Sequence, residues 1–470
     1  MVFSSIEFLF FFLPAVLIGY YLLKRWRKAA NVFLTVMSLG FYAFGAPKFF
    51  LIMIASIIAN WGFGLWVDKV RDNRKQAKRA LAVMVVFNLG LLGVYKYLMF
   101  IMNSLNLWFS LNIPVPQITL PIGISFFTFQ AMSYVIDVYR GNGKVQKNLI
   151  NVCLYISFFP QLIAGPIVRY QTVADEIDGR KENLDDFIFG VQRFMRGLCK
   201  KMLLANNLGL LVDTAFALET GTLSVISSWL AACAYLMQVY YDFSGYSDMA
   251  IGLGRMFGFH FLENFNYPFI CKTVAEFWKR WHISLGTWFT DYLYIPLGGS
   301  RVKSKWRLAF NMFMVWSLTG LWHGAAWTYF LWGCGFFVML AIERFTGLGK
   351  WMNKHAGWGH FYAMFMVVTI TTMIRSDNLS VAATMFGTMF GVNGAPLWNT
   401  LTGTFLREYG VFIAAGVIFS LPIPEFLRDR VHIPEKLIKV VGAVALVALT
   451  AVSVSYVAVD SYNPFIYFNF

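Results

Sequence analysis

The stretch SLTGLWHGAAWTYF, residues 317–330, places one histidine, His323, among tryptophans, glycines and alanines. The chain around it is apolar, and from Ala309 to Ile342 it contains no Asp, Glu, Lys or Arg. A helix needs about 20 apolar residues to cross the hydrocarbon core of a bilayer. This segment therefore predicts one or two membrane spans, and it places the ionisable side chain of His323 at membrane depth.

The composition of the 470 residues supports the same conclusion. Hydrophobic residues make up 58% of the chain and charged residues only 13%, against roughly 25% charged residues in an average soluble domain. A soluble protein of this composition would lack the polar surface to cover itself. We therefore expect an all-α, polytopic membrane protein that forms a single membrane domain over residues 1–470.

Apolar runs predict about 11 transmembrane helices. They are expected over residues 5–23, 30–46, 49–67, 80–102, 118–139, 149–168, 221–241, 309–342, 360–374, 409–423 and 438–458, with 309–342 counted as one or two. Three other apolar segments are interrupted by polar residues and are expected to form re-entrant or interfacial helices: 187–215, 246–262 and 284–298.

The net charge of +15 comes largely from short basic clusters between the apolar runs. KRWRK at 24–28, DKVRDNRKQAKR at 68–79 and RGNGKVQK at 140–147 alternate with loops of little charge, such as 103–117. By the positive-inside rule these clusters face the cytoplasm, so the N-terminus is expected outside, ahead of a retained first span rather than a signal peptide. The basic excess is typical of contact with anionic membrane lipid rather than with nucleic acid.

His323 has two interpretations. An intramembrane ionisable residue is by default a candidate for a functional site, but a neutral imidazole also serves as a hydrogen-bonding link between helices. Burial favours the neutral ring, which is the form that a general base needs. Gly320 and Gly324 flank it and leave room for a substrate or for a closely packed helix. Structural or loop roles are expected for His260, His355, His360 and His432.

A further histidine, His282, lies in EFWKRWHISLGTWFTDYLYIPLGGS, residues 276–300, where charged side chains mix with aromatic ones. This stretch predicts an amphipathic or re-entrant piece on the cytoplasmic side. Lys279 and Arg280 are interpreted either as anchors at the membrane surface or as a basic mouth. Such a mouth would attract an anionic donor, for example a phosphopantetheine thioester.

Polar groups also interrupt two apolar stretches, YYDFSGYSDMAIGLGR at 240–255 and FPQLIAGPIVRY at 159–170. Both predict helix breaks, which at membrane depth are tolerated only inside protein or along a cavity. They fit a tunnel, and equally the broken helices of a transporter.

The five cysteines form no CxxC pair, and the sequence shows no metal-ligand spacing and no nucleotide-binding motif. No metal site is therefore expected.

The stretches WKRWHISLGTWFTDYLYIPLGGS and, 41 positions after its histidine, GLWHGAAWTY resemble the paired histidine motifs of the membrane-bound O-acyltransferase (MBOAT) family. LPIGISFFTFQAMSYVIDVYRG at 120–141 and the terminal NPFIYF are similar to one bacterial branch of that family. That branch serves the O-acetylation of alginate, and its relatives act on peptidoglycan and on teichoic acid. The resemblance covers nearly the whole chain.

The resemblance implies helices arranged around a central tunnel, with His323 as the catalytic histidine at its constriction and His282 as a second catalytic histidine towards the cytoplasm. The donor would be a thioester, acetyl-CoA or an acyl carrier protein, with no bound cofactor. The acceptor would be a hydroxyl of a polysaccharide outside the bacterial inner membrane, and a partner of SGNH-hydrolase type would complete the transfer. Substrate contacts are expected from Lys279, Arg280, Trp281, Asp242, Ser244, Tyr246, Asp248, Trp322 and Gln161.

The residues alone leave other functions open. An acyltransferase, of acetyl or of D-alanyl groups, needs His323 as a base. A transporter or flippase would move an acylated carrier through the same tunnel without covalent change; inverted repeats would favour it, and none is evident in the sequence. A scaffold for a polysaccharide machine would work without His323.

Overall fold

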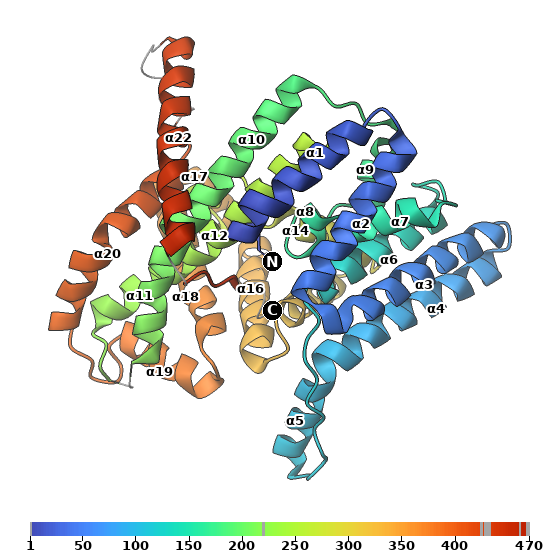
Figure 1. The fold of residues 1–470 in the computed structure, drawn as a ribbon. Helices are drawn as coiled ribbons and strands as arrows, with labels where there is room; N and C mark the ends of the chain where they lie inside the picture. Colours follow the sequence, from blue (N-terminus) through green and yellow to red (C-terminus); the bar gives the residue numbers. More distant parts are fainter. Residues whose placement is uncertain (1, 219–220, 424–425, 427–433, 460–461, 467–470) are drawn as a thin grey trace. The chain divides into compact units, whose positions relative to one another are not determined.

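The computed structural model describes residues 2–218, 221–423, 426, 434–459 and 462–466. The regular structure of these residues is helical, with no β-strand (Figure 1), which confirms the all-α prediction. The chain divides into two compact units, Met1–Phe194 with Ser247–Leu262 and Met195–Tyr246 with Glu263–Phe470. Two helices, α10 (Leu184–Cys199) and α12 (Val225–Met256), carry residues of both units.

The first unit is organised around α6 (Ile124–Arg140), which is buried at every residue from Ile124 to Val138. Helices α3 and α4 pack against α6, and α7 packs against α2. Because α6 is covered on all sides, it carries apolar and small polar residues all round instead of a single apolar stripe. The other elements of this unit are η1 (Glu7–Phe12), α1 (Leu13–Leu23), α2 (Arg27–Gly45), η2 (Pro47–Phe49), α3 (Phe50–Lys69), α4 (Arg74–Leu92), η3 (Gly93–Tyr97), α5 (Leu98–Phe109), α7 (Leu149–Ser157), α8 (Phe159–Leu162) and α9 (Tyr170–Gly179).

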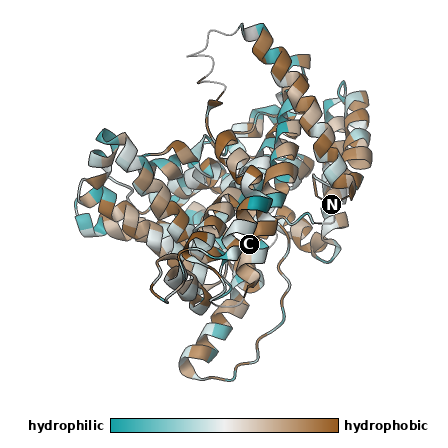
Figure 2. Ribbon diagram, turned by 90° about the vertical axis from the view of Figure 1, so that its left-hand side faces the viewer, coloured by the Kyte–Doolittle hydropathy of each residue, from teal (hydrophilic) through white to brown (hydrophobic). Residues whose placement is uncertain are grey.

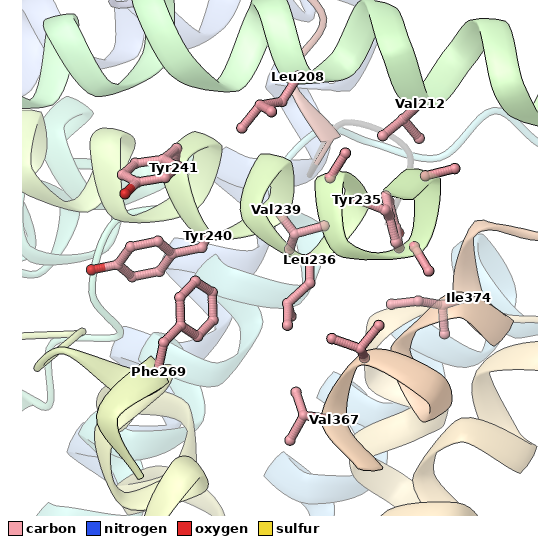
Figure 3. Close-up of a cluster of buried hydrophobic side chains, with 14 of the residues drawn as sticks. Leu208, Val212, Tyr235, Leu236, Val239, Tyr240, Tyr241, Phe269, Val367 and Ile374 are labelled. Carbon is pink, nitrogen blue, oxygen red and sulfur yellow. The ribbon is translucent and has the colours of Figure 1, made fainter. Parts of the chain in front are cut away.

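The second unit holds both motif histidines, and its core lies along the first part of α12. Side chains of α11 and α18 pack there with those of α12 (Figure 3). The labelled members of this core are Leu208, Val212, Tyr235, Leu236, Val239, Tyr240, Tyr241, Phe269, Val367 and Ile374. The elements are η4 (Lys200–Ala205), α11 (Asn206–Ala217), η5 (Pro268–Ile270), α13 (Val274–Arg280), α14 (Ile283–Phe289), η6 (Thr290–Tyr294), α15 (Lys305–His323), α16 (Trp327–Phe345), α17 (Leu348–Lys354), α18 (Ala356–Arg375), α19 (Leu379–Met389), α20 (Thr400–Phe419) and α22 (Glu435–Val459).

Several helices are suited to a bilayer. Among the described residues, six helical runs are long and apolar enough to cross one: Pro47–Lys69, Arg74–Phe109, Trp327–Phe345, Ala356–Arg375, Thr400–Phe419 and Lys436–Val459. Figure 2 shows brown, hydrophobic residues along many of the helices. These runs support a multi-pass membrane protein, while the count of about 11 spans and the single membrane domain stay predictions.

The predicted helix breaks have different outcomes. The charge-free segment 309–342 divides into two helices, α15 and α16, with a break at 324–326. The chain also leaves the helical conformation after α8, as the stretch 159–170 predicts. The break predicted within 240–255 is wrong, because α12 continues through this stretch to Met256. Its polar side chains are accommodated by partners from distant parts of the chain, as described below for Asp242.

Candidate active site

His323 ends α15, and close packing of α15 on α16 determines where it lies. A Cβ atom on Gly320 would lie 2.3 Å from the carbonyl oxygen of Tyr329, and one on Gly333 would lie 2.3 Å from that of Trp316. Small residues of this kind let two helix backbones approach each other closely. Of the two roles that the sequence allows for Gly320, the structure supports packing of a neighbouring helix.

The imidazole of His323 is buried, and only 5% of the residue is exposed. Its Nδ1–H donates a hydrogen bond to the carbonyl oxygen of Thr319 at 2.8 Å. A carbonyl oxygen only accepts, so the proton lies on Nδ1 and the neutral ring has Nε2 as its basic nitrogen. The indole rings of Trp322 and Trp332 each lie 5.0 Å from the imidazole, between centroids. This environment limits the access of water to the ring.

His282 lies at the corner between α13 and α14, with 1% of the residue exposed. The centroids of the His282 and His323 rings are 6.2 Å apart. Phe243, on α12, meets the His282 ring edge to face at 4.5 Å, and Trp322 lies 5.9 Å from it. Three segments of the second unit thus bring the two motif histidines together: α12, the corner before α14 and the end of α15.

The backbone of His282 is in the left-handed region, with φ 45° and ψ 52°. A non-glycine residue there costs on the order of 1–3 kcal/mol and persists only where its surroundings hold it. Asn264 holds this corner. Its carbonyl oxygen accepts the N–H of Ile283 at 2.9 Å, and its side-chain oxygen accepts the N–H and hydroxyl of Ser284 at 3.2 and 2.9 Å.

The environment keeps the His282 imidazole uncharged. Burial, and secondly the neighbouring His323, hold the pKa of His282 well below its usual range. A neutral imidazole either accepts a proton from a hydroxyl or donates its N–H to an oxygen, and both actions suit acyl transfer. The described residues contain no group of three or more His, Cys, Asp or Glu side chains that could hold a metal ion.

The helix that leads to His282 is anchored by Glu343, a buried carboxylate near the end of α16. Its two oxygens accept the N–H groups of Val274 and Ala275, at 2.6 and 3.0 Å. These N–H groups belong to the first turn of α13 and have no partner within that helix. The negative charge also complements the positive end of the helix. Glu343 therefore fixes the start of α13, whose last residue comes two positions before His282.

The three predicted substrate contacts at the end of α13 differ in exposure. Lys279 is exposed to solvent. The guanidinium of Arg280 lies 3.0 Å from a carboxylate oxygen of Glu276, and it also donates to the carbonyl oxygen of Asn266 at 3.2 Å. Trp281 is buried in an aromatic cluster. Lys279 is thus the most accessible of the three for an anionic donor.

Asp242, on α12 next to Phe243, is buried and ion-paired. One carboxylate oxygen lies 2.7 Å from Nζ of Lys201, and the other accepts the N–H of Ile466 at 2.9 Å. Lys201 is buried too, and its ammonium also donates to the carbonyl oxygen of Pro464. Both carboxylate oxygens are thus occupied within the protein, which favours a structural role for Asp242.

Ser244 and Tyr246 follow on the same helix and are also buried. The ring of Tyr246 packs on that of Phe465 at 4.9 Å, so the segment 462–466 contacts α12 at two points. The Ser244 hydroxyl has no hydrogen-bond partner among the described residues. Of these two side chains, Ser244 is therefore the better candidate for contact with a ligand.

Two predicted substrate contacts, Gln161 and Asp248, belong to the first unit. The Gln161 side-chain amide donates to the carbonyl oxygen of Tyr155 at 2.5 Å. Asp248 accepts from Nε of Arg193 at 2.8 Å and lies 2.7 Å from its Nη2. Each has partners within its own unit, and their roles towards a substrate stay predictions.

The remaining histidines do not belong to the pair. His260, in the first unit, lies 2.7 Å from a carboxylate oxygen of Glu176. His355 and His360 are exposed, before and within α18. His432 lies outside the described residues.

The sequence of the chain was compared with known proteins. The profile of MBOAT, the membrane-bound O-acyltransferase family, matches residues 145–382, which include both histidines of the pair. A Pseudomonas putida protein named probable alginate O-acetylase AlgI is 39% identical over 491 residues, which cover 100% of both chains. The chain belongs to the membrane-bound O-acyltransferase family. It is therefore a multi-pass membrane enzyme that transfers acyl groups.

Two further relatives show the range of this family. The acyltransferase is 32% identical to the peptidoglycan O-acetyltransferase of Helicobacter pylori, over 84% of this chain and 81% of the relative. It is also 32% identical to the teichoic acid D-alanyltransferase of Bacillus subtilis, over 50% of this chain and 61% of the relative. The resemblance inferred from the motifs is thus confirmed.

Sequence reasoning missed the residues that support the histidine pair, namely Asn264, Glu343 and Lys201. For Glu343 and Lys201 a signal was available, because each is an ionisable residue beside or within apolar sequence. For Asn264 no local signal was available, since its partners at 283 and 284 become neighbours only through the turn.

Proposed function

We propose that this acyltransferase moves an acetyl group from a cytoplasmic thioester, acetyl-CoA or an acyl carrier protein, to a hydroxyl group of an extracytoplasmic polysaccharide such as alginate. The full-length similarity to the P. putida protein named for alginate O-acetylation supports this substrate class. The relative named for peptidoglycan supports the same reaction on another polysaccharide. The basic clusters support an inner-membrane protein with its N-terminus outside.

The observation that carries the mechanism is the fixed tautomer of His323, with Nδ1–H bound to a backbone carbonyl. In this proposal Nε2 takes the proton of the acceptor hydroxyl while the hydroxyl oxygen bonds to the thioester carbonyl carbon. The C–S bond then breaks and the acyl group stays on the acceptor oxygen. The imidazolium returns its proton to the leaving thiolate, which departs as a thiol. Base catalysis of this kind supplies roughly 10²- to 10⁴-fold in rate.

His282 serves the donor side in this proposal. A neutral imidazole next to His323 can donate its N–H to the carbonyl oxygen of the thioester, where negative charge grows in the transition state. The rings of Phe243 and Trp322 beside it would keep water from hydrolysing the donor. Lys279, exposed at the end of α13, would attract the phosphates of the donor.

The acyl group then leaves the membrane enzyme. We propose that the acceptor hydroxyl of this step belongs to a separate partner of SGNH-hydrolase type, extracytoplasmic or membrane-anchored. A hydroxyl of the polysaccharide then attacks the partner's acetyl ester, the ester bond to the partner breaks, and the partner regains its hydroxyl. The assay below distinguishes use of the donor from transfer to the acceptor, because it measures the loss of the donor thioester and the labelling of the acceptor independently.

The proposal is tested on the purified full-length protein in nanodiscs with radiolabelled acetyl-CoA. Thioester loss and label transfer are followed for wild type and for His323→Ala. His355→Ala is the matched control, because it removes an exposed histidine of the same unit. We expect transfer by His323→Ala to fall about 10²- to 10⁴-fold in protein that thermal unfolding shows to be folded, and the control to stay at the wild-type rate.

Equal turnover by wild type and His323→Ala would overturn the base role and leave His323 as an interhelical link. No turnover in any variant calls for two further arms, one with an acetylated carrier protein as donor and one with the SGNH-type partner added. Movement of an acylated carrier without covalent change would establish the transporter alternative.

D-alanyl transfer is a second candidate, because the B. subtilis relative named for it matches half of the chain. The same assay with a D-alanyl carrier-protein thioester as the donor distinguishes D-alanyl transfer from acetyl transfer. We expect acetyl transfer to be the faster reaction, since the relatives that match over the full length are named for O-acetylation.

A further inference from the structure

Two basic loops that are far apart in the sequence meet in the first unit. The loop between α3 and α4 carries Arg71, whose Nη2 donates to the carbonyl oxygen of Val138 at 3.0 Å, near the end of α6. The next loop begins at Gly141, which has φ 78°. A Cβ atom there would lie 3.2 Å from Nη2 of Arg71. The clusters 68–79 and 140–147 therefore form one basic surface.

A cavity of about 220 Å³ opens within this basic surface. It is lined by Val67, Arg71, Arg74, Ala77 and Tyr139. Val67 and Ala77 are buried and form an apolar floor, whereas the two arginines are exposed. A guanidinium binds phosphate through two parallel N–H groups. The cavity thus combines an apolar base with donors suited to a phosphate group.

Basic residues outnumber acidic ones in the segment that lines the cavity. Helix α4 starts at Arg74, and its first turn carries no acidic residue to complement the positive helix end. The side chain of Asn73 caps this end by accepting the N–H groups of Lys75 and Gln76. The cluster 68–79 holds six basic and two acidic residues, and no carboxylate within the described part of the chain forms an ion pair with Arg74. A bound anion would offset this excess of positive charge.

The cavity also lies at the ends of two candidate membrane spans. The membrane-spanning run Pro47–Lys69 ends beside it, and the run Arg74–Phe109 begins beside it. Trp66, near the end of the first run, is exposed, which is typical of an aromatic anchor at the membrane interface. A phosphate reaching Arg71 and Arg74 at this depth is most simply the headgroup of a phospholipid.

We propose that the cavity between α3, α4 and α6 binds the phosphate of an anionic phospholipid headgroup. Arg71 and Arg74 hold the phosphate, and the remaining volume holds a small headgroup such as glycerol. A cavity of about 220 Å³ is smaller than the roughly 300–1,000 Å³ of drug-sized ligand pockets, so it suits a headgroup better than a nucleotide. The site does not depend on the catalytic proposal.

Native mass spectrometry of the full-length protein with phosphatidylglycerol or phosphatidylcholine tests the site. Arg74→Gln is the primary variant, because Arg71 also caps α6 and its loss would disturb the fold. Lys48→Gln is the matched control: it removes one exposed positive charge at the other end of α3. We expect wild type to retain phosphatidylglycerol over phosphatidylcholine and Arg74→Gln to weaken this binding about fivefold, as for one arginine near an anionic surface.

Arg74→Lys keeps the charge but loses the forked geometry, and it should bind with intermediate strength. Equal retention of both lipids by wild type would overturn the proposal, as would equal phosphatidylglycerol binding by wild type and Arg74→Gln. Addition of inorganic phosphate or coenzyme A distinguishes the source of the phosphate. Displacement of the lipid by either compound at millimolar concentration would show that the site serves a soluble phosphate and would also overturn the lipid assignment.

Discussion

His282 is kept neutral by its surroundings, and this has a consequence for the stability of the folded enzyme. Its pKa lies well below the usual range in the folded state, and it returns to about 6.5 when the chain unfolds. Between these values the unfolded chain binds more protons, so protonation favours unfolding. The contribution of the neutral ring to stability is therefore complete above about pH 6.5 and is lost progressively as the pH falls from this value through the folded-state pKa.

Thermal unfolding of wild type and His282→Gln from about pH 8 to about pH 5 measures this effect. We expect the wild type to lose more stability than the variant as the pH falls, because only the wild type must protonate the buried ring. His360→Gln removes an exposed histidine and should follow the wild-type curve. Parallel curves for wild type and His282→Gln would contradict the prediction.

The ion pair of Asp242 and Lys201 leads to a second prediction at this scale. Removing one partner of a buried pair leaves an uncompensated charge and typically costs about 3–5 kcal/mol. Asp242→Asn and Lys201→Met should each lower the free energy of unfolding by this order, and the double variant should lose less than the sum. Denaturant titration of the purified protein gives these values. Unchanged stability with a raised KM for the donor in Asp242→Asn would instead make Asp242 a substrate contact.

At the scale of elements, the contact between α15 and α16 depends on glycine. A methyl group on Gly320 would lie 2.3 Å from a backbone carbonyl oxygen of α16, and backbone cannot move aside as a side chain can. Overpacking of this kind costs roughly 1–3 kcal/mol or more. Gly320→Ala should therefore lower the thermal midpoint and, because it displaces the end of α15, reduce acyl transfer.

Gly410→Ala is the control for this prediction. Gly410 lies in α20 with no heavy atom within 4 Å of an added Cβ, so alanine should be neutral or slightly stabilising there. Equal thermal midpoints for Gly320→Ala and wild type would show that α15 and α16 can separate without cost.

The elements also show which part of the fold was predictable. The sequence left 309–342 open as one or two helices, because the charge-free run exceeds one span and contains glycine in the middle. The structure divides it. The continuity of α12 did not follow from local sequence, because the buried polar residues of 240–255 depend on Lys201 and on residue 466. The polar residues within this apolar stretch indicate a break, because the sequence shows the polarity of a residue but not its distant partner.

At the scale of the whole molecule, the basic clusters predict the orientation in the membrane, and this prediction is open to a direct test. Lys75 lies in the cluster 68–79 and Gln117 in the segment that follows the next predicted span; both are exposed. A cysteine at Gln117 should react with an impermeant maleimide in intact spheroplasts, and one at Lys75 only after lysis. The wild type, with its five cysteines, sets the background. The opposite pattern would invert the proposed topology.

The positions of the site residues along the whole chain also explain which parts of the site could be predicted from the sequence. Family membership and the two histidines were predictable, because the motifs around them are contiguous in sequence. The roles of the supports were not: Glu343 stands out as an ionisable residue beside apolar sequence, but its partner N–H group is 69 residues away, and Asn264 acts across a turn. Residues that position a site through backbone contacts leave little trace in the sequence pattern.

The contact between Asp242 and Ile466 has a consequence for the synthesis of the protein on the ribosome. The two residues are 224 positions apart, so at 5–20 residues per second the ribosome needs roughly 10–45 s to supply the second after the first. During this interval the Asp242 carboxylate of the nascent chain lacks the N–H donor of Ile466. The contact thus forms only after residue 466 has been made, and a chain arrested before that residue would enter the membrane with one oxygen of the buried carboxylate lacking its backbone donor.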